Sequence, residues 1–400
     1  METRTALEQT GNATFDSVLF TQIQNNVVWG HRANVMSVPT DCDQRDERRG
    51  WMGDAALIAE STTYNFRPAA FYTAWLNQLV DDQSADGQVP NFVPDLGSGA
   101  GAPNWQSAFP TVLWSQWKYA GDEELVKRNW PAVLKYANYW IAEIDKARPM
   151  DFPSGFGDWV QAGPTKSEPH LTGMFAALHD LGLVAEMATA IGAKTAAANA
   201  TAARKKGGKQ FYDTWYNASK SCFNACLQSE NSYALWLGAD VVPAADVQAI
   251  ATQTAKDVLV TNMGHTTSGI IGIKAIFETM SKNGRADLPV LMAGVKTYPS
   301  YGYMIHNEYE PATTLWELWN SDTQGPSMNS RNHIMFGSIS SWFYRYLCGI
   351  DVPEGVMGYD EISIHPVGVG VANSTNNAAA CEIVTPRGGA ASAWKGPAGE

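Results

Sequence analysis

Residues 37–55 read Ser-Val-Pro-Thr-Asp-Cys-Asp-Gln-Arg-Asp-Glu-Arg-Arg-Gly-Trp-Met-Gly-Asp-Ala, and the rest of the chain is interpreted outward from them. Acids and arginines crowd this stretch, namely Asp41, Asp43, Asp46, Glu47 and Asp54 with Arg45, Arg48 and Arg49. Pro39, Gly50 and Gly53 interrupt any regular period. The stretch predicts an ordered loop that leads into a helix, with Asp54 as the cap of that helix.

Crowded carboxylates in one loop can take different protonation states. Burial and neighbouring negative charge raise the pKa of a carboxyl, whereas a nearby arginine lowers it. Such a loop can hold one carboxyl protonated beside ionised ones, and acid/base catalysis on a neutral, oxygen-rich substrate needs this division. A solvated charged turn is the ordinary alternative. Trp51 favours the catalytic interpretation, because its ring offers a flat surface for a sugar.

The pattern Asp-Cys-x-Gln-Arg-Asp-Glu-Arg-x-Gly-Trp-x-Gly-Asp-Ala closely resembles the signature of the α-L-rhamnosidases of glycoside hydrolase family 78. The match departs from the family only at Asp43, where proline is common. The resemblance implies an all-α toroid, the (α/α)6 six-hairpin barrel. It also implies an inverting glycosidase that releases terminal α-L-rhamnose from glycosides or polysaccharides.

The composition describes a large acidic protein of 400 residues, 45% of them hydrophobic, which is enough for a large core. The formal net charge of −12 argues against a nucleic-acid partner, because such a protein needs a basic face. No apolar run approaches the roughly 20 residues of a membrane span. The N-terminus also lacks the apolar core of a signal peptide. We expect neither a nucleic-acid nor a membrane partner, while oligomeric state and compartment stay open.

The five cysteines, an odd count, do not indicate a disulfide framework. Cys222 and Cys226 are expected to be core residues rather than a bridge, because an i, i+4 pair within one helix holds its Cβ atoms about 5–6 Å apart. If the chain were secreted, four sequons would be glycan acceptors. They begin at Asn12, Asn199, Asn217 and Asn373.

Helical periodicity dominates from about residue 15 to residue 350. The expected helices cover 15–28, 56–66, 71–80, 105–120, 123–142, 172–191, 194–216, 246–259, 270–282, 288–295, 312–319 and 336–347. Pro131 is expected to interrupt or restart its helix. Because strands and helices do not alternate, a doubly wound sheet is not expected. Long loops after the helices predict a toroid of paired helices whose site is built from loops at one end.

After residue 350 the sequence changes to short alternating segments, at 360–367 and 381–385, which predict strands. About 50 residues with two or three strands cannot close an independent sandwich. We expect residues 1–350 to form the catalytic barrel and 351–400 to begin a truncated C-terminal β-sandwich domain. Family members usually carry further β domains, so the resemblance implies that the chain is a fragment or a partial gene model.

Inverting hydrolysis needs a second, ionised carboxyl about 6.5–9.5 Å from the acid. Glu317 is the candidate, in the segment Ala312-Thr-Thr-Leu-Trp-Glu-Leu-Trp. The alternative is an exposed helix acid between two core tryptophans. This segment resembles the family's general-base segment, and Glu47 aligns with its general acid. The resemblance therefore implies that Glu47 donates a proton and Glu317 activates water.

The resemblance also implies a sugar subsite whose residues come from several loops. These are Asp41, Trp51, Asp54, Trp105, Asp158, Trp159 and His333. A core position is the alternative for each tryptophan and for His333. Glu308 and Glu310 are extra acids near the presumed base and make its assignment less secure.

No metal or other cofactor is expected. The seven histidines show no spacing such as His-x-x-x-His, and no Gly-x-Ser-x-Gly elbow supports a serine nucleophile. Two alternatives to a rhamnosidase stay open. One is an (α/α)6 hydrolase that cuts another sugar, and the other is a non-catalytic carbohydrate-binding remnant, against which the retained pair Glu47 and Glu317 speaks.

Overall fold

The computed structural model describes residues 5–43, 47–325, 329–367 and 376–396. Residues 44–46 of the acidic loop and the sequon at Asn373 lie outside these ranges. Within the described ranges, every helix is too short or too polar to cross a lipid bilayer.

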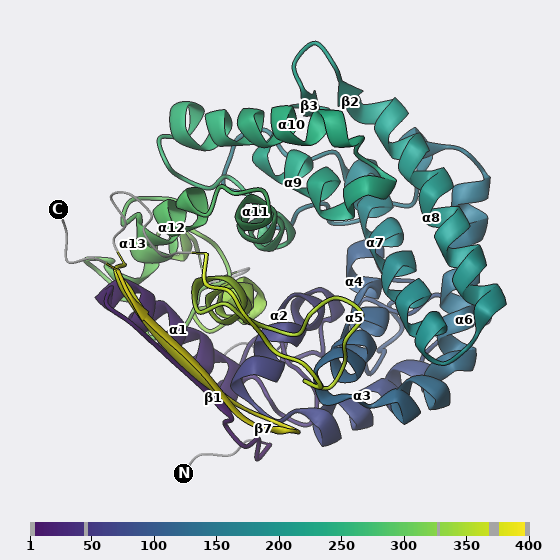
Figure 1. The fold of residues 1–400 in the computed structure, drawn as a ribbon, viewed down its shortest axis with the longest axis horizontal. Helices are drawn as coiled ribbons and strands as arrows, with labels where there is room; N and C mark the ends of the chain where they lie inside the picture. Colours follow the sequence, from purple (N-terminus) through teal and green to yellow (C-terminus); the bar gives the residue numbers. More distant parts are fainter. Residues whose placement is uncertain (1–4, 44–46, 326–328, 368–375, 397–400) are drawn as a thin grey trace.

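The helices form two concentric rings (Figure 1). The inner ring consists of α2 (Met52–Asn65), α5 (Ala108–Ser115), α7 (Pro169–Ala190), α9 (Gln228–Leu237), α11 (Ile270–Lys282) and α14 (Ile339–Trp342). Each inner helix contacts the next, and α14 contacts α2, so the ring closes. The outer ring consists of α1 (Val18–Ala33), α3 (Ala69–Asp81), α6 (Glu123–Asp145), α8 (Lys194–Trp215), α10 (Ala244–Lys256) and α12 (Asp287–Gly294). The predicted toroid of paired helices is confirmed.

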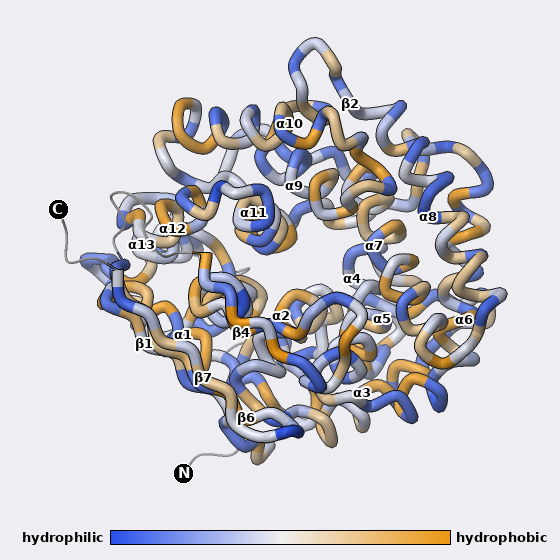
Figure 2. The backbone as a smooth tube through the Cα atoms, in the orientation of Figure 1, coloured by the Kyte–Doolittle hydropathy of each residue, from blue (hydrophilic) through white to orange (hydrophobic). Residues whose placement is uncertain are grey.

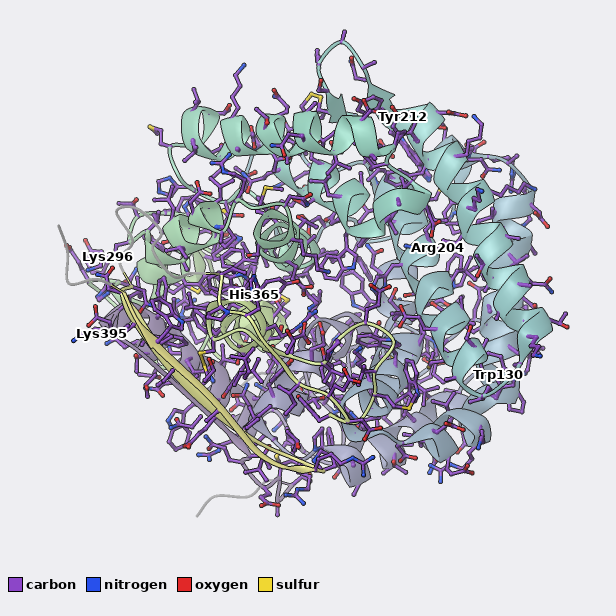
Figure 3. The ribbon with its side chains drawn as sticks, viewed as in Figure 1. Trp130, Arg204, Tyr212, Lys296, His365 and Lys395 are labelled. Atoms are coloured by element: carbon purple, nitrogen blue, oxygen red, sulfur yellow. A yellow bond between two sulfur atoms is a disulfide. The ribbon has the colours of Figure 1, made fainter. Side chains whose placement is uncertain are left out.

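Burial distinguishes the two rings. Helix α2 buries all of its residues but Thr63, as expected of a helix enclosed on every side. Helix α8 instead buries one stripe that includes Phe211 and Trp215. Hydrophilic and hydrophobic residues accordingly alternate along the outer helices α6 and α8 (Figure 2). Arg204 ties the outer ring to the inner one, because its Nε donates to the Leu178 carbonyl of α7 at 3.2 Å (Figure 3).

The loops that precede the inner helices meet at one end of the toroid. Asp158, from the loop before α7, accepts a hydrogen bond from Gly269 at the start of α11. Trp319 donates to the Ser268 carbonyl in the loop before α11 at 2.9 Å. Because the N-terminal end of a helix carries a partial positive charge, the start of α2, which follows the acidic loop directly, favours ionised carboxylates.

A small sheet joins the two ends of the chain. Strand β1 (Gly11–Phe15) pairs antiparallel with β6 (Ala378–Thr385), and β6 pairs with β7 (Gly388–Lys395). Figure 1 shows this yellow hairpin lying along the purple N-terminal segment. The strand predicted at 381–385 is confirmed, and that at 360–367 shortens to β5 (Ser363–Ile364), paired with β4 (Ile350–Asp351). The domain boundary at residue 350 stays a prediction.

Three local expectations are wrong. The helix expected at 15–28 begins at Val18, because Phe15 belongs to β1 and the Ser17 side chain caps the helix. Helix α6 continues through Pro131, whose cost is outweighed by the buried face around it. Asp54 lies in the first turn of α2 rather than capping it.

The expectation for Cys222 and Cys226 is also wrong, because the two form a disulfide with their Cα atoms 5.1 Å apart. They do not share a helix. Cys222 belongs to the short strand β3 (Cys222–Phe223), which pairs with β2 (Tyr216–Asn217), and Cys226 follows with φ 62°. This tight turn brings the two residues within disulfide range, which a helix would not.

A second disulfide, between Cys348 and Cys381, anchors the hairpin to the barrel across a sequence separation of 33 residues. We expect Cys381→Ala to lower the free energy of unfolding by about 3–4 kcal/mol, because the bridge closes a long loop. Cys226→Ala is the matched control and should cost about 2 kcal/mol, since its separation is 4 residues. Urea unfolding checks this, and equal losses would contradict the loop-length argument.

Candidate active site

The acidic loop and the segment that carries Glu317 meet through His333. The His333 Nε2 atom lies 2.9 Å from Oδ1 of Asp54, and its Nδ1 atom lies 3.9 Å from Oε2 of Glu317. The backbones of Cys42 and His333 also form an isolated antiparallel bridge. Residues almost 300 positions apart therefore share one buried cluster.

Glu317 sits on a loop, and the helix expected at 312–319 is absent among these described residues. Its backbone N–H donates to the Ser330 carbonyl at 2.9 Å, and the Ser330 N–H donates to its Oε2 at 2.8 Å. A further backbone hydrogen bond, from His333 N–H to the Leu315 carbonyl at 2.9 Å, joins the same two segments of the chain. With 1% of its surface exposed, Glu317 is not the exposed acid of the alternative interpretation.

Glu47 is half-buried at the rim of the same region. The indole Nε1 of Trp51 donates to its Oε1 at 2.6 Å, so the predicted sugar platform also orients the predicted acid. The neighbouring Arg48 has φ 49°, a conformation that non-glycine residues rarely adopt outside functional or tightly packed loops.

The charges of neighbouring acids affect the pKa of buried Asp41. Burial is the main cause that raises the pKa of Asp41 to about 6, and the charges of Asp54 and then Glu47 raise it further. His333 opposes this rise. The Arg49 N–H also holds Asp41 in place, with a hydrogen bond of 3.0 Å to Oδ1. Asp41 is therefore the group in this loop whose pKa responds to the neighbouring acids.

His333 has an acid on several sides. Burial by itself lowers the pKa of His333, but the charge and hydrogen bond of Asp54 outweigh it, with further contributions from Glu317 and Asp41. The net effect raises the pKa, so the imidazole tends to be charged. The imidazole of His333 lies between the acidic loop and Glu317, the predicted base.

An aromatic wall lines this end of the barrel. The Phe156 ring contacts Trp105 with centroids 4.7 Å apart, Trp159 at 5.6 Å and Trp51 at 6.3 Å. Three predicted aromatic residues are thus joined by one that was not predicted. The sequence gives little indication of this role for Phe156, which is only the first residue of the segment Phe156-Gly-Asp-Trp159.

A cleft of about 470 Å³ opens beside this wall, where Phe156, Trp159 and Leu318 contribute to its lining. A larger cavity of about 650 Å³ lies toward the C-terminal ends of the inner helices, near Glu60 and Lys274. The larger cavity is lined by none of the predicted site residues, whereas Asp158 and Trp159 line the smaller one.

Asp158 lines that cleft, but its carboxylate is engaged in holding α11. Its oxygens accept the backbone N–H groups of Gly269 at 2.8 Å and of Ile271 and Gly272 at 3.0 Å each. Burial raises the pKa of Asp158 to about 6 despite these bonds. The structure gives Asp158 a capping role, and its contact with substrate stays a prediction.

The extra acids differ from Glu317 in their surroundings. Glu308 is exposed, and Glu310 lies on the surface with its Oε2 3.0 Å from Nε of Arg331. Neither is enclosed as Glu317 is, and the role of Glu317 as base stays a prediction.

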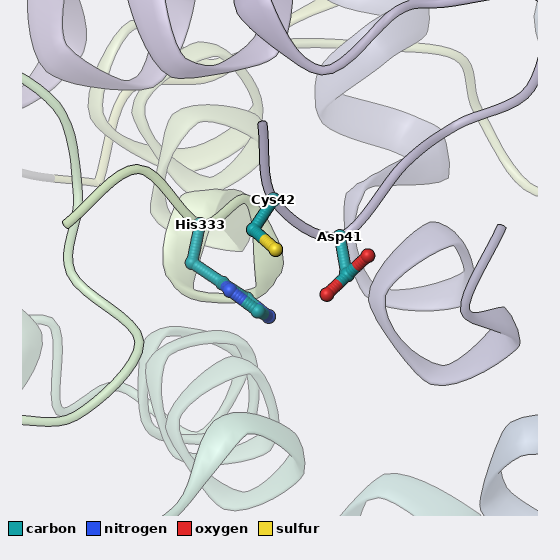
Figure 4. A group of neighbouring side chains, drawn as sticks. All are labelled: Asp41, Cys42 and His333. Atoms are coloured by element: carbon teal, nitrogen blue, oxygen red, sulfur yellow. The ribbon is translucent and has the colours of Figure 1, made fainter. Parts of the chain in front are cut away.

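Asp41, Cys42 and His333 bring one oxygen, one sulfur and one nitrogen within 4.8 Å of one another (Figure 4). Sequence reasoning missed this group, because it weighed only the spacing of neighbouring histidines. Asp41 and Cys42 are adjacent in one loop, and His333 comes from a segment almost 300 positions later.

Gly53 makes room for the aromatic wall, since a Cβ placed there would lie 2.6 Å from the Trp105 ring. We expect Gly53→Ala to lower the free energy of unfolding by about 1–3 kcal/mol and to raise KM by displacing that ring. Gly389→Ala, at a position with open space, is the control and should change stability by less than about 0.5 kcal/mol. Urea unfolding and steady-state kinetics check both, and equal behaviour of the two variants would contradict the packing argument.

Known proteins resemble this chain over most of its length. An α-L-rhamnosidase of Streptomyces avermitilis is 32% identical over 361 residues, which are 87% of this chain and 33% of that protein. The solved structure of α-L-rhamnosidase from Dictyoglumus thermophilum has a TM-score of 0.91 and 31% identity, covering 99% of this chain and 44% of that one. A Streptomyces avermitilis α-L-rhamnosidase complexed with L-rhamnose has a TM-score of 0.89 and 26% identity, covering 99% and 37%.

The chain thus spans less than half the length of each of these proteins. The predicted six-hairpin architecture is confirmed by the solved structures and by the family model of the bacterial α-L-rhamnosidase six-hairpin glycosidase domain, which matches residues 8–347. This chain belongs to that family.

Proposed function

We propose that this barrel hydrolyses terminal α-L-rhamnosides with inversion, using Glu47 as general acid and Glu317 as general base. The observation that carries the proposal is the contact between two distant acidic motifs. Buried Glu317 lies beside His333, and His333 contacts Asp54 in the first turn of α2, which directly follows the loop that carries Glu47.

The two acids have different surroundings, as inverting hydrolysis requires. Glu317 accepts the Ser330 N–H and lies near the imidazole of His333, which favours its ionised form. Glu47 lies at the half-buried rim beside the Trp51 indole. In the reaction, the Glu47 carboxyl donates its proton to the glycosidic oxygen as the bond to C1 breaks. Water attacks C1 from the opposite face and gives a proton to Glu317.

The remaining predicted residues suit a small deoxy sugar. Asp41, Asp54 and His333 offer charged groups to its hydroxyls, and buried charged groups make such hydrogen bonds strong. The aromatic wall around Phe156 offers apolar surface to the ring and its methyl group. The Streptomyces avermitilis structure, solved with L-rhamnose, supports rhamnose as the sugar.

A panel of nitrophenyl glycosides tests the assignment. We expect turnover of the α-L-rhamnopyranoside to exceed that of α-L-arabinosides and β-D-glucosides by at least tenfold. Preference for another sugar would identify a different hydrolase on the same toroid. Binding of rhamnose in calorimetry, with no turnover of any glycoside, would identify a carbohydrate-binding remnant and contradict the proposal.

A further inference from the structure

The group formed by Asp41, Cys42 and His333 has the donors of a transition-metal site. All three side chains are buried, with 1%, 0% and 4% of their surface exposed. Figure 4 shows them converging on one space, where their ligand atoms lie within 4.8 Å of one another. Thiolate, imidazole and carboxylate together suit Zn²⁺, which takes tetrahedral sulfur, nitrogen and oxygen ligands.

The backbone already fixes two of these donors. Cys42 and His333 face each other in the antiparallel bridge, so their positions do not depend on a bound ion. Asp41 precedes Cys42 and is held by the Arg49 N–H. A preorganised set of three ligands lowers the cost of ordering a site around the ion.

The hydrogen-bond partners of the His333 ring provide a second observation that favours a cation between these three side chains. Its Nε2 contacts Asp54, whereas its buried Nδ1 has no hydrogen-bond acceptor among the described residues. Oε2 of Glu317 lies 3.9 Å from Nδ1, which is beyond hydrogen-bonding distance. Once the imidazole has lost its proton, a buried ring nitrogen without a hydrogen-bond acceptor can coordinate a metal.

We propose that Asp41, Cys42 and His333 form an inhibitory site for Zn²⁺ and related thiophilic cations. The thiol of Cys42, which hydrogen-bonds to Asp41, and the imidazolium of His333 each lose one proton to solvent as the sulfur–metal and nitrogen–metal bonds form. Three protein ligands leave a fourth position for water. The bound ion takes Asp41 and His333 away from the sugar, so inhibition competes with substrate. The site itself does not depend on the proposed function.

Cobalt binding tests the ligands directly on the unmodified chain. All five cysteines are described, and four of them form the two disulfides, so a thiolate-to-cobalt band must arise from Cys42. We expect one Co²⁺ per chain, with a near-ultraviolet thiolate-to-cobalt charge-transfer band that Zn²⁺ abolishes. Absence of this band at saturating cobalt would overturn the proposal, whether or not the chain is active.

Variants then test which residues hold the ion. We expect Cys42→Ser to weaken Zn²⁺ binding at least tenfold in equilibrium dialysis and to lose the cobalt band. His306→Asn changes an exposed histidine and should bind zinc as the wild type does. If Cys42→Ser does not fold, Cys42→Ala is used, and the cobalt spectrum of the wild type still decides. Unchanged zinc affinity in a folded Cys42 variant would overturn the proposal.

Discussion

Replacing Glu317 by Gln is expected to lower kcat for nitrophenyl α-L-rhamnoside by about 10²- to 10⁴-fold, the usual contribution of a general base. The amide keeps the size of the side chain but cannot accept the proton of the attacking water. KM should change much less, because the loss falls on the transition state. Steady-state kinetics on purified variants measure both quantities.

The matched control is Glu310→Gln, which changes an exposed acid seven positions earlier that pairs with Arg331. We expect this variant to keep kcat within about twofold, because exposed ion pairs contribute little. A large loss in Glu310→Gln with near-normal turnover in Glu317→Gln would reassign the base.

Leaving-group chemistry separates the roles of the two acids. For Glu47→Gln we expect a small loss of turnover with dinitrophenyl rhamnoside and a large loss of turnover with alkyl rhamnosides, because a poor leaving group needs protonation. The loss in Glu317→Gln should be similar for both. An equal loss in Glu47→Gln across leaving groups would contradict its role as acid.

The second large effect concerns stability and lies away from the sugar cleft. Arg345, in the turn Phe343–Leu347, contacts Glu60 at 2.9 Å and Glu278 at 3.1 Å. Lys274 reaches the same two glutamates at 2.5 and 2.6 Å. We expect Arg345→Met to lower the free energy of unfolding by about 3–5 kcal/mol, because it leaves two buried carboxylates to share the single positive charge of Lys274.

Arg387→Met is the matched control for that change. Arg387 pairs with Asp360 at 2.6 Å, but both side chains are more than half exposed. An exposed pair contributes at most about 1 kcal/mol. Urea unfolding at neutral pH compares the variants, and equal losses would contradict the importance of burial.

The stability that Glu60 and its cationic partners contribute depends on pH in a definite direction. Burial by itself raises the pKa of Glu60, but Arg345 and Lys274 outweigh it and hold that pKa well below the ordinary value of 4.5. A lowered carboxyl pKa in the folded state stabilises the protein above pH 4.5 and loses this effect as pH falls. The difference between wild type and Arg345→Met should therefore be largest near neutral pH and shrink below pH 4.5.

Most helices of the barrel were predicted because each depends on a short-range pattern, but α9 of the inner ring was missed. The six-hairpin closure of the ring was implied by the resemblance of the motifs. The helix at 312–319 failed for a physical reason. Its residues follow a helical period, but the backbone of Glu317 pairs with Ser330, which no local pattern reveals. Strand β1 was missed similarly, because its partner lies more than 360 residues later.

The same limit applies to the site. Glu47 and Glu317 were identified through motifs, whereas the contact of Asp54 with His333 and the central place of Phe156 arise only when separate loops meet. The pair Cys222 and Cys226 was misjudged because a helix was assumed where Cys222 lies in β3 and the chain turns directly after that strand.

The most direct test of the account is the configuration of the sugar as it is released, followed by proton NMR during the first turnovers. If Glu47 protonates the leaving oxygen while Glu317 activates the attacking water, an α-L-rhamnoside yields β-L-rhamnose first. This product then equilibrates with the α anomer. Initial appearance of the α anomer would show retention and contradict the roles given to Glu47 and Glu317.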